Sequence, residues 1–384
     1  MESAGRPVPC FPPALAAGTE RQKCSAAGAG GGRNDAQHHQ IALLGTDGQK
    51  RECFLRLRQP GKHPTRRSTC GNAACICKEI WRKFYLPSDG SDLIQIQNRK
   101  ERTNITDWNL IAKRIKEADA ILIGASNGLS ITEGLHLFAD NAAFEGLFGD
   151  FKRKYGLRCI LQGMMARWPN EEEKWAFWAR LIHHYCGQYQ PTQVMEDLKA
   201  IVGDKDYFVV TSNGECHFEL CGFDLEKLYE IEGNWLTMQC ARPCHDTRYP
   251  SLELAEKLAA AEQDGRVPAE LVPHCPKCGG PMEIHMGAGK RMLPDTAAQE
   301  RLRNFLDMYH RKKLVVLELG IGWRNQLIKA PLMRLVASEP NATYVTINLG
   351  EVYIDPAIRD KSFGLDGRLD ELLPKLREAC AAAR

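Results

Sequence analysis

Residues 120–130 read Ala120-Ile121-Leu122-Ile123-Gly124-Ala125-Ser126-Asn127-Gly128-Leu129-Ser130, an apolar run that leads directly into a Gly- and Ser-rich turn. A continuous apolar run of this length predicts a strand that is buried on both faces. In the turn, glycines would let the backbone approach a phosphate, and the next helix would offer free N–H donors to it. A tight turn with a purely structural role fits the local pattern equally well, because the spacing departs from G-x-G-x-x-G.

Three further apolar runs have the same character, at residues 206–211, 314–319 and 343–348. Patterns of helical periodicity lie between the runs, including residues 144–155 and 172–188. Strands that are separated by helices predict an α/β fold with a parallel sheet and helices on both faces.

A further helix is expected just before the first strand. Its apolar residues recur at helical spacing, and Thr106 is placed to cap its first turn. These apolar residues are Trp108, Ile111 and Ile115.

Each of the four predicted strands ends in small or polar residues. These residues are Gly124, the pair Ser212-Asn213, Gly320 and Asn348. Ligands of open parallel sheets bind at the carboxyl ends of the strands. The four strand ends therefore predict a single binding site at this edge of the sheet.

Composition limits the classes of protein to consider. The 384 residues are 43% hydrophobic and 26% charged, with a formal net charge of +3. These are ordinary values for a soluble globular chain of about two domains, and they exclude a small disulfide scaffold. No apolar run reaches about 18 residues, so no membrane span is predicted, and the balanced charge does not favour nucleic-acid binding. The cysteine number, 15, is odd, and no signal-peptide core opens the chain, which favours reduced thiols, some metal ligation and a cytoplasmic location.

The first hundred residues differ from the rest. Residues 1–77 carry 11 Lys+Arg against 5 Asp+Glu, a net of +6 that leaves −3 for the remainder. They contain a Gly/Ala run at 26–32 and no sustained periodicity. We expect a low-complexity, disordered extension over residues 1–100, for which organellar targeting remains an alternative. Its cysteines have no second pair near them and are interpreted as incidental; they are Cys70, Cys75 and Cys77.

Two close cysteine pairs predict a metal site. Cys240 and Cys244 are followed, after a segment with helical periodicity, by Cys275 and Cys278. Four thiolates supply a tetrahedral Zn²⁺ site, and such a closed site is structural because no position is left for water. The site would hold together a module of about residues 236–290. His245 and His274 lie beside the cysteines as alternative ligands, but four cysteines suffice without them.

Two further polar stretches can carry chemistry. In Thr211-Ser212-Asn213-Gly214-Glu215, an amide and a carboxylate could orient a ribose and a reacting water, or simply end a strand. In Glu230-Ile231-Glu232-Gly233, a carboxylate near a ribose could act as a general base. On local pattern alone, a solvated acidic turn explains the second stretch better.

These motifs, in their order along the chain, resemble those of the sirtuin family of NAD-dependent protein deacylases and ADP-ribosyltransferases. The resemblance covers residues 104–384. Gly128-Leu129-Ser130 with Gly134 is similar to the G-x-S-x-x-x-G core of the family's first NAD loop. Ser212–Glu215 is similar to Q-N-x-D, which places Asn213 on the ribose-binding Asn and Glu215 on the Asp. The segment 230–233 lies where the family has E-x-H-G, just before the zinc module.

The resemblance extends to the last two predicted strands. Gly320-Ile321-Gly322 matches a turn that contacts the adenosine ribose, and Ile347-Asn348 matches an Ile-Asn pair that reaches the same ribose. The implied fold is a Rossmann-like domain joined to a small helical domain with one structural Zn²⁺ per chain. The implied NAD contacts are Gly124, Ala125, Ser126, Asn127, Gly128, Ser130, Gly134, Asn213, Gly320, Gly322 and Asn348.

Two departures refine the resemblance. Glu232 replaces the usual catalytic His, and Gly134-Leu135-His136-Leu137-Phe138 replaces the family's P-D-F-R segment. Both features resemble the macrodomain-associated class M sirtuins, as does the L-E-L-G-x-G element at 317–322. That class is associated with ADP-ribosylation of lipoyl-carrier proteins.

The resemblance therefore implies transfer of ADP-ribose from NAD to a protein acceptor, for which a lipoyl-carrier protein is a candidate. The implied catalytic residues are Asn213, Glu215 and Glu232. One alternative is deacylation of an acyl-lysine protein, with Glu232 in place of the His. Another is a non-catalytic NAD-binding sensor. Neither a nucleic acid nor a membrane is expected as a partner.

Overall fold

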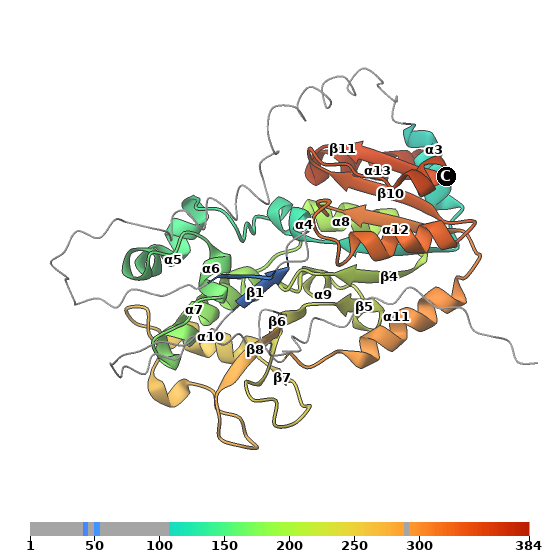
Figure 1. Ribbon diagram of the computed structural model, residues 1–384. Coiled ribbons are helices and arrows are strands. Elements are labelled where there is room, and N and C mark those ends of the chain that lie inside the picture. Colours follow the sequence, from blue (N-terminus) through green and yellow to red (C-terminus); the bar gives the residue numbers. More distant parts are fainter. Residues whose placement is uncertain (1–40, 45–49, 54–106, 288–291, 384) are drawn as a thin grey trace, which may run out of the picture.

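The centre of the molecule is a parallel sheet. The computed structural model describes residues 41–44, 50–53, 107–287 and 292–383 (Figure 1). Its six-stranded sheet has the order β11-β10-β9-β3-β4-β5, and all neighbouring strands are parallel. The strands are β3 (Ala120–Ala125), β4 (Asp206–Thr211), β5 (Leu228–Glu230), β9 (Leu314–Leu319), β10 (Thr343–Asn348) and β11 (Ser362–Asp366). Read from the β5 edge and numbered along the chain, the order is 3-2-1-4-5-6, which is that of a doubly wound sheet.

The four predicted strands are confirmed, and β3 runs two residues beyond the predicted apolar run, with all six residues buried. The two edge strands were not predicted. β5 has only three residues, and β11 carries Gly364 in the middle of five, so neither shows an apolar run. Backbone hydrogen bonding to the adjacent strand defines each of them, since β5 pairs with β4 and β11 pairs with β10.

Helices cover both faces of the sheet, as predicted (Figure 1). One face packs against α3 (Trp108–Lys116), α8 (Gln193–Val202) and α13 (Leu369–Ala382). The other packs against α11 (Thr296–Met308) and α12 (Lys329–Ser338). β3 shows how one strand serves both layers, because Ile121 and Ile123 face the first set of helices and Leu122 faces the second.

The predicted cap of α3 is wrong by one residue. The Asp107 side chain accepts a hydrogen bond from the backbone N–H of Leu110 at 2.9 Å and therefore caps the helix. A carboxylate at this position is a good cap, because it accepts a hydrogen bond from an otherwise free N–H. Its negative charge also interacts favourably with the positive end of the helix dipole. Thr106 itself lies outside the described residues.

A second lobe lies beside the carboxyl ends of the strands and has its own core (Figure 1). An antiparallel sheet of order β7-β6-β8 packs with helices there, and the core is aromatic, with Phe148 and Phe177 stacked at 4.4 Å. Its elements are α5 (Ala142–Tyr155), α6 (Ile160–Met164), α7 (Glu171–Ile182), the π-helix η1 (His183–Gly187), β6 (Gly233–Cys240), β7 (Tyr249–Pro250), α10 (Leu252–Ala261) and β8 (Met282–Met286).

The remaining elements are short. They are β1 (Ile41–Leu44), β2 (Lys50–Cys53), α4 (Asn127–Thr132), α9 (His217–Leu220), and the 3-10 helices η2 (Leu225–Lys227), η3 (Ala269–Leu271) and η4 (Pro356–Lys361). β1 and β2 pair antiparallel. The rest of the first hundred residues, including Cys70, Cys75 and Cys77, lies outside the described residues, so the disordered extension stays a prediction.

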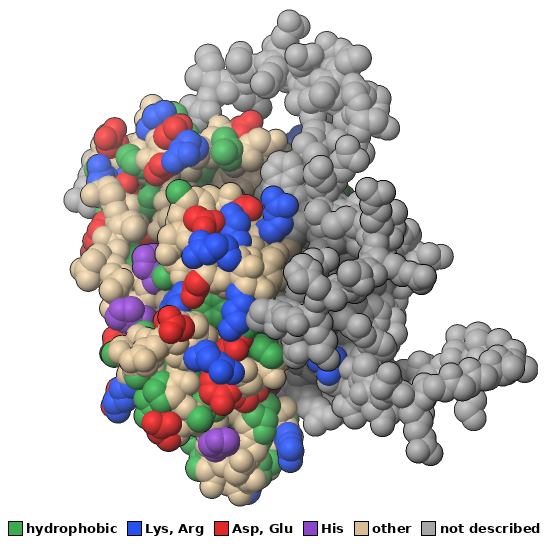
Figure 2. Space-filling model, turned by 90° about the vertical axis from the view of Figure 1, so that its left-hand side faces the viewer, with side chains coloured by type: hydrophobic (Ala, Val, Ile, Leu, Met, Phe, Trp, Pro, Cys, Tyr) green, Lys and Arg blue, Asp and Glu red, His purple; other side chains and the backbone are tan. Residues whose placement is uncertain are grey.

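Two features of the described residues bear on possible partners, namely the mixture of charges at the surface and the length and polarity of the helices. On the face shown in Figure 2, Lys and Arg side chains are interspersed with Asp and Glu over the described residues. Among the helices that the structure describes, none is both long and apolar enough to cross a membrane.

A buried ion pair fixes α12 to the sheet. Lys329, at the start of α12, donates to the Glu318 carboxylate in β9, and both side chains are fully buried. Tyr344 and Thr346, from β10, also donate to this carboxylate. The segment 320–328, which joins β9 to α12, is thus anchored at both of its ends.

Lys329→Met should lower the free energy of unfolding by about 3–5 kcal/mol, because it leaves the Glu318 charge buried without its cation. Urea unfolding at pH 7 measures this. The matched control is Lys375→Met, at an exposed position on α13, which should change stability by less than about 0.5 kcal/mol. Equal effects of the two substitutions would contradict the structural role of the pair.

Candidate functional site

The sheet has one switch point, between β3 and β9. These are the first and fourth strands of the sheet along the chain, and the connections that leave them run to opposite faces. In doubly wound sheets, ligands bind outside the carboxyl ends of the strands at such a point. We call the residues that follow β3, β4, β5, β9 and β10 the carboxyl-end rim.

The segments after β3 and β9 touch through their backbones. The N–H of Gly128 donates to the carbonyl of Gly320 at 2.9 Å. A Cβ on Gly128 would lie 2.5 Å from the Cα of Gly320, and a Cβ on Gly320 would lie 2.5 Å from the Leu129 nitrogen. Gly320 also has a φ of +62°, which favours glycine. Both positions therefore need glycine for space.

Polar side chains from three segments meet beside this contact. Ser212, after β4, donates to the Ser126 hydroxyl at 3.1 Å. The Asn325 amide reaches Ser126 at 2.8 Å and Ser212 at 3.3 Å. Asn325 was not predicted, because no motif marks it; its one signal is that it is a polar residue in the segment that follows a predicted binding turn.

Asn213 is held in place and has one open acceptor. Its backbone N–H donates to the Thr211 hydroxyl at 3.0 Å, and its side-chain amide donates to the Ser126 carbonyl at 3.2 Å. The residue is 5% exposed. Its Oδ1 is buried and has no hydrogen-bond partner among the described residues. Because an orphaned buried acceptor is costly, this oxygen is suited to a donor on a bound ligand.

Glu215 lies two residues further on and is 2% exposed. One carboxylate oxygen accepts a hydrogen bond from the Ser130 hydroxyl at 2.5 Å, which joins this loop to α4. Burial raises the pKa of Glu215 above its ordinary value, while His217 and Ser130 act in the opposite direction. The predicted pair Asn213 and Glu215 is thus brought together with the first loop.

Two acidic residues at the end of β5 have different surroundings, because Glu230 is the last residue of the strand and Glu232 follows it. Glu230 accepts a hydrogen bond from the Asn234 amide, and burial raises its pKa to about 8. Glu232 lies in a tight turn between β5 and β6, and its side chain is exposed. The protein packed around Glu232 nevertheless raises its pKa. Within the described residues, no hydrogen bond or ion pair engages the Glu232 carboxylate.

The other predicted contact residues fall into two groups. Gly124 serves packing, because a Cβ there would lie 2.3 Å from a methyl carbon of Leu332. The carbonyl of Ala125 accepts a hydrogen bond from Thr211, Asn127 begins α4, and Gly134 has a φ of +94° after its end.

On the β9–β10 side of the rim, Gly322 and Asn348 lie close to one residue. A Cβ on Gly322 would lie 3.4 Å from a carboxylate oxygen of Glu351. The Asn348 amide donates to the Glu351 carbonyl at 2.9 Å. These two predicted residues therefore share a neighbour at the rim.

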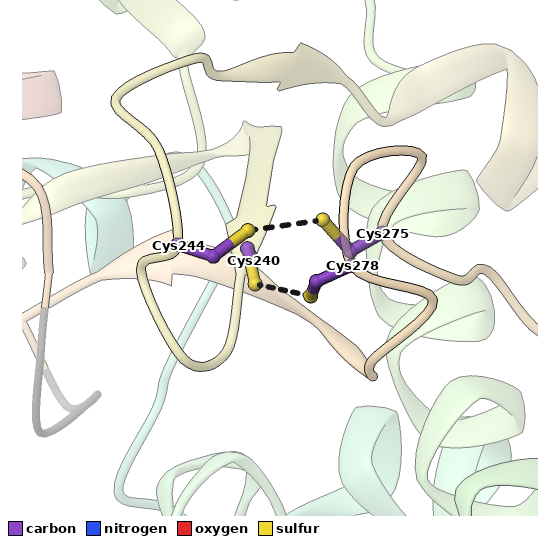
Figure 3. Close-up of side chains that lie close together, drawn as sticks. All are labelled: Cys240, Cys244, Cys275 and Cys278. Atoms are coloured by element: carbon purple, nitrogen blue, oxygen red, sulfur yellow. Dashed lines mark hydrogen bonds between the residues drawn. The ribbon is translucent and has the colours of Figure 1, made fainter.

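The four predicted cysteines come together in the second lobe (Figure 3). The Sγ atoms of Cys240 and Cys278 are 3.7 Å apart, those of Cys244 and Cys275 are 3.6 Å apart, and all four lie within 4.8 Å of one another. Backbone N–H groups of Cys244 and Arg242 lower the pKa of Cys240 to about 6. The cluster can hold a metal ion.

The two neighbouring histidines are not needed as ligands. His245 lies 3.0 Å from the Cys244 sulfur through Nδ1 and 2.7 Å from the Tyr249 hydroxyl through Nε2. His274 forms a β-bridge with Pro281.

No protein-family model matches the chain. Among curated proteins, it is 31% identical over 264 residues to a protein ADP-ribosyltransferase of Staphylococcus aureus strain Mu50, covering 67% of this chain and 83% of that protein. It is 27% identical over 256 residues to a probable bifunctional ADP-ribose hydrolase/ADP-ribosyltransferase of Fusarium oxysporum f. sp. cubense. That match covers 64% of this chain and 42% of the fungal protein.

Gly320→Ala should destabilise the protein more than Gly350→Ala. Both glycines have positive φ, +62° and +77°, but only the Cβ at 320 meets backbone atoms. The left-handed conformation costs an alanine about 1–2 kcal/mol at either position. The clash at 320 should cost about 2 kcal/mol more. Urea unfolding of both variants measures the difference, and equal losses would argue against the close contact of the two segments.

Proposed function

This chain belongs to the same family as the Staphylococcus aureus protein ADP-ribosyltransferase, and from that premise we propose that it transfers ADP-ribose from NAD to a protein acceptor. The observation that carries the proposal is the open Oδ1 of Asn213, buried at the rim and held by Ser126. A ribose hydroxyl or an amide N–H of NAD would complete its hydrogen bonding.

The type of enzyme that we propose is a sirtuin that resembles the class M sirtuins. The order of the motifs along the chain supports this, as does a doubly wound sheet beside a lobe with a four-cysteine cluster. In this assignment residues 104–384 form the catalytic region, and about residues 236–290 form an inserted zinc module. A lipoyl-carrier protein is the acceptor that class M implies.

The side chains at the rim have distinct proposed roles. NAD supplies an ADP-ribosyl group whose ribose carbon becomes electrophilic as nicotinamide leaves. Asn213 binds and orients the adjacent ribose. Glu215 contributes a buried negative charge, which favours positive charge developing on a sugar. Glu232 takes a proton from the acceptor nucleophile, and its raised pKa makes it a stronger base than an ordinary Glu.

We also propose that the cysteine cluster holds Zn²⁺. Tetrahedral ligation with Zn–S bonds of about 2.3 Å places sulfurs about 3.8 Å apart, close to the distances of 3.6 and 3.7 Å in the cluster. Four sulfur ligands leave no place for water, so the ion would be structural. It would join the end of β6 to the turn before β8.

Incubation with NAD, a lipoyl-carrier protein and an acyl-lysine peptide, followed by mass spectrometry, tests the function. We expect an ADP-ribose adduct on the carrier protein. Asn213→Ala should reduce its formation by at least about 100-fold, as loss of one positioned polar group in an active site does. The matched control is Asn341→Ala. Asn341 is exposed and lies just before β10, at the amino ends of the strands and so away from the rim.

The other products have equally clear meanings. Loss of the acyl group with O-acyl-ADP-ribose would replace the transferase with a deacylase in which Glu232 acts as the base. Bound NAD without any product would favour a sensor. Full activity of Asn213→Ala would overturn the placement of the site.

The freshly purified protein should contain about one zinc ion per chain by elemental mass spectrometry, because the four thiolates form a complete site. Cys278→Ser should lose most of the metal and unfold at a lower temperature, since metal-binding free energy contributes to folding. Cys380→Ser, on α13 and outside the cluster, should keep both metal and stability. Purified protein without bound metal would refute the zinc assignment.

A further inference from the structure

A buried polar cluster shares the α4 region and the loop after β4 with Glu215, and it takes no direct part in the proposed reaction. We call it the Glu133 cluster; it consists of Glu133, Tyr189, Thr192 and His217. The side chains of Glu133 and His217 are 0% and 3% exposed. Glu133 directly follows α4, and His217 begins α9 after the Glu215 loop.

Both ring nitrogens of His217 face acceptors. Nδ1 lies 2.7 Å from a carboxylate oxygen of Glu133, and Nε2 lies 3.1 Å from the backbone carbonyl of Tyr185. A carbonyl only accepts, and a neutral imidazole has only one N–H. An imidazolium at His217, with an N–H on each ring nitrogen, donates both hydrogen bonds, one of them to the Glu133 carboxylate.

The other carboxylate oxygen of Glu133 is also engaged by donors. This oxygen accepts hydrogen bonds from the Thr192 hydroxyl at 2.7 Å and the Tyr189 hydroxyl at 2.8 Å. The Tyr189 ring also stacks on His217, with centroids 3.9 Å apart. Two hydroxyl donors and an imidazolium complete the hydrogen bonding of a carboxylate that water does not reach.

The charge on His217 acts on Glu215. Burial works against the charged form of His217, but the carboxylates of Glu133 and Glu215 outweigh it and raise the pKa of His217. In return, His217 lowers the pKa of Glu215 against the effect of burial. Ser130 lies in α4, one turn before Glu133, and donates to Glu215. The short helix α4 and the residue that follows it therefore supply both Ser130, which contacts Glu215, and Glu133, which contacts His217.

We propose that His217 is a positioning residue, a buried imidazolium held by Glu133 that keeps the Glu215 carboxylate ionised at the carboxyl-end rim. This role rests on the proposed function, in which Glu215 lies beside the reacting ribose. The protonation of His217, by contrast, is a property of the free protein.

Few titratable groups lie near enough to His217 to set its charge. The titratable groups that face His217 are Glu133 from the end of α4, Glu215 from its own loop, and Tyr189, whose hydroxyl also contacts Cys221 at 3.0 Å. Burial raises the pKa values of Tyr189 and Cys221, so both are neutral near pH 7. The two glutamates are therefore the groups that set the charge of His217.

Histidine NMR of the full chain without NAD tests the protonation directly. We expect the ¹³C-labelled ring of His217 to remain an imidazolium at pH 7.5, above the ordinary pKa of about 6.5. In Glu133→Gln its pKa should fall by about 1–3 units, because the opposite charge is lost. The signal is assigned from its absence in His217→Gln or, if that variant does not fold, from its contact with the Tyr189 ring. A neutral His217 at pH 7 in the wild type overturns the proposal.

The pH dependence of kcat tests the effect on Glu215. Without the cation, the pKa of Glu215 rises further, so more of it is protonated at a given acidic pH. The acid limb should therefore move to higher pH by about one unit in both His217→Gln and Glu133→Gln.

The matched control is His310→Gln, because His310 pairs with Glu339 at 2.8 Å at an exposed site far along the chain from the loop. It should leave the acid limb in place. A uniform fall in kcat with an unmoved acid limb in His217→Gln would mean a merely structural role. If the wild type does not turn over NAD, the proposed function fails, and NMR alone decides the state of His217.

Discussion

The backbone contact between Gly128 and Gly320 is the constraint on which the site depends. It continues the pairing of β3 with β9 past the ends of both strands, since the Ser126 N–H also donates to the Leu319 carbonyl at 3.3 Å. The two segments at the switch point are therefore as fixed as the sheet itself. Ser126 anchors Asn213 and Asn325, so the polar groups of the rim take their places from this one contact.

Two buried ion pairs support the rim from different sides. Lys329 and Glu318 lie under the segment after β9, and His217 and Glu133 lie behind the loop after β4. Buried pairs of this kind add little net stability, because desolvation offsets the attraction. Their value here is geometric, since each pair accepts only one arrangement of the elements that carry it.

The sequence predicted the centre of the fold well for a physical reason. Strands that helices cover on both faces must be apolar throughout, so β3, β4, β9 and β10 are visible as runs. Edge strands such as β5 and β11 need no such run. The cysteine cluster was predictable because metal ligands come in close pairs. Asn325, Glu133 and His217 were not, because their partners lie far away in sequence: Glu133 and His217 are 84 residues apart, and only the folded chain joins them.

The π-helix η1 makes the site sensitive to the insertion or deletion of single residues in this helix. Its Gln188 N–H reaches back five residues to the His183 carbonyl at 2.9 Å, so this turn holds one residue more than an α-helical turn. The extra residue determines the direction in which the next groups point around the helix axis. In this orientation the Tyr185 carbonyl contacts His217, and the Cys186 thiol contacts the Glu215 carbonyl. Deleting one residue from η1 would rotate these groups by about 100° relative to α7. A one-residue deletion inside a surface loop has no such effect, so in this helix insertions and deletions matter more than substitutions.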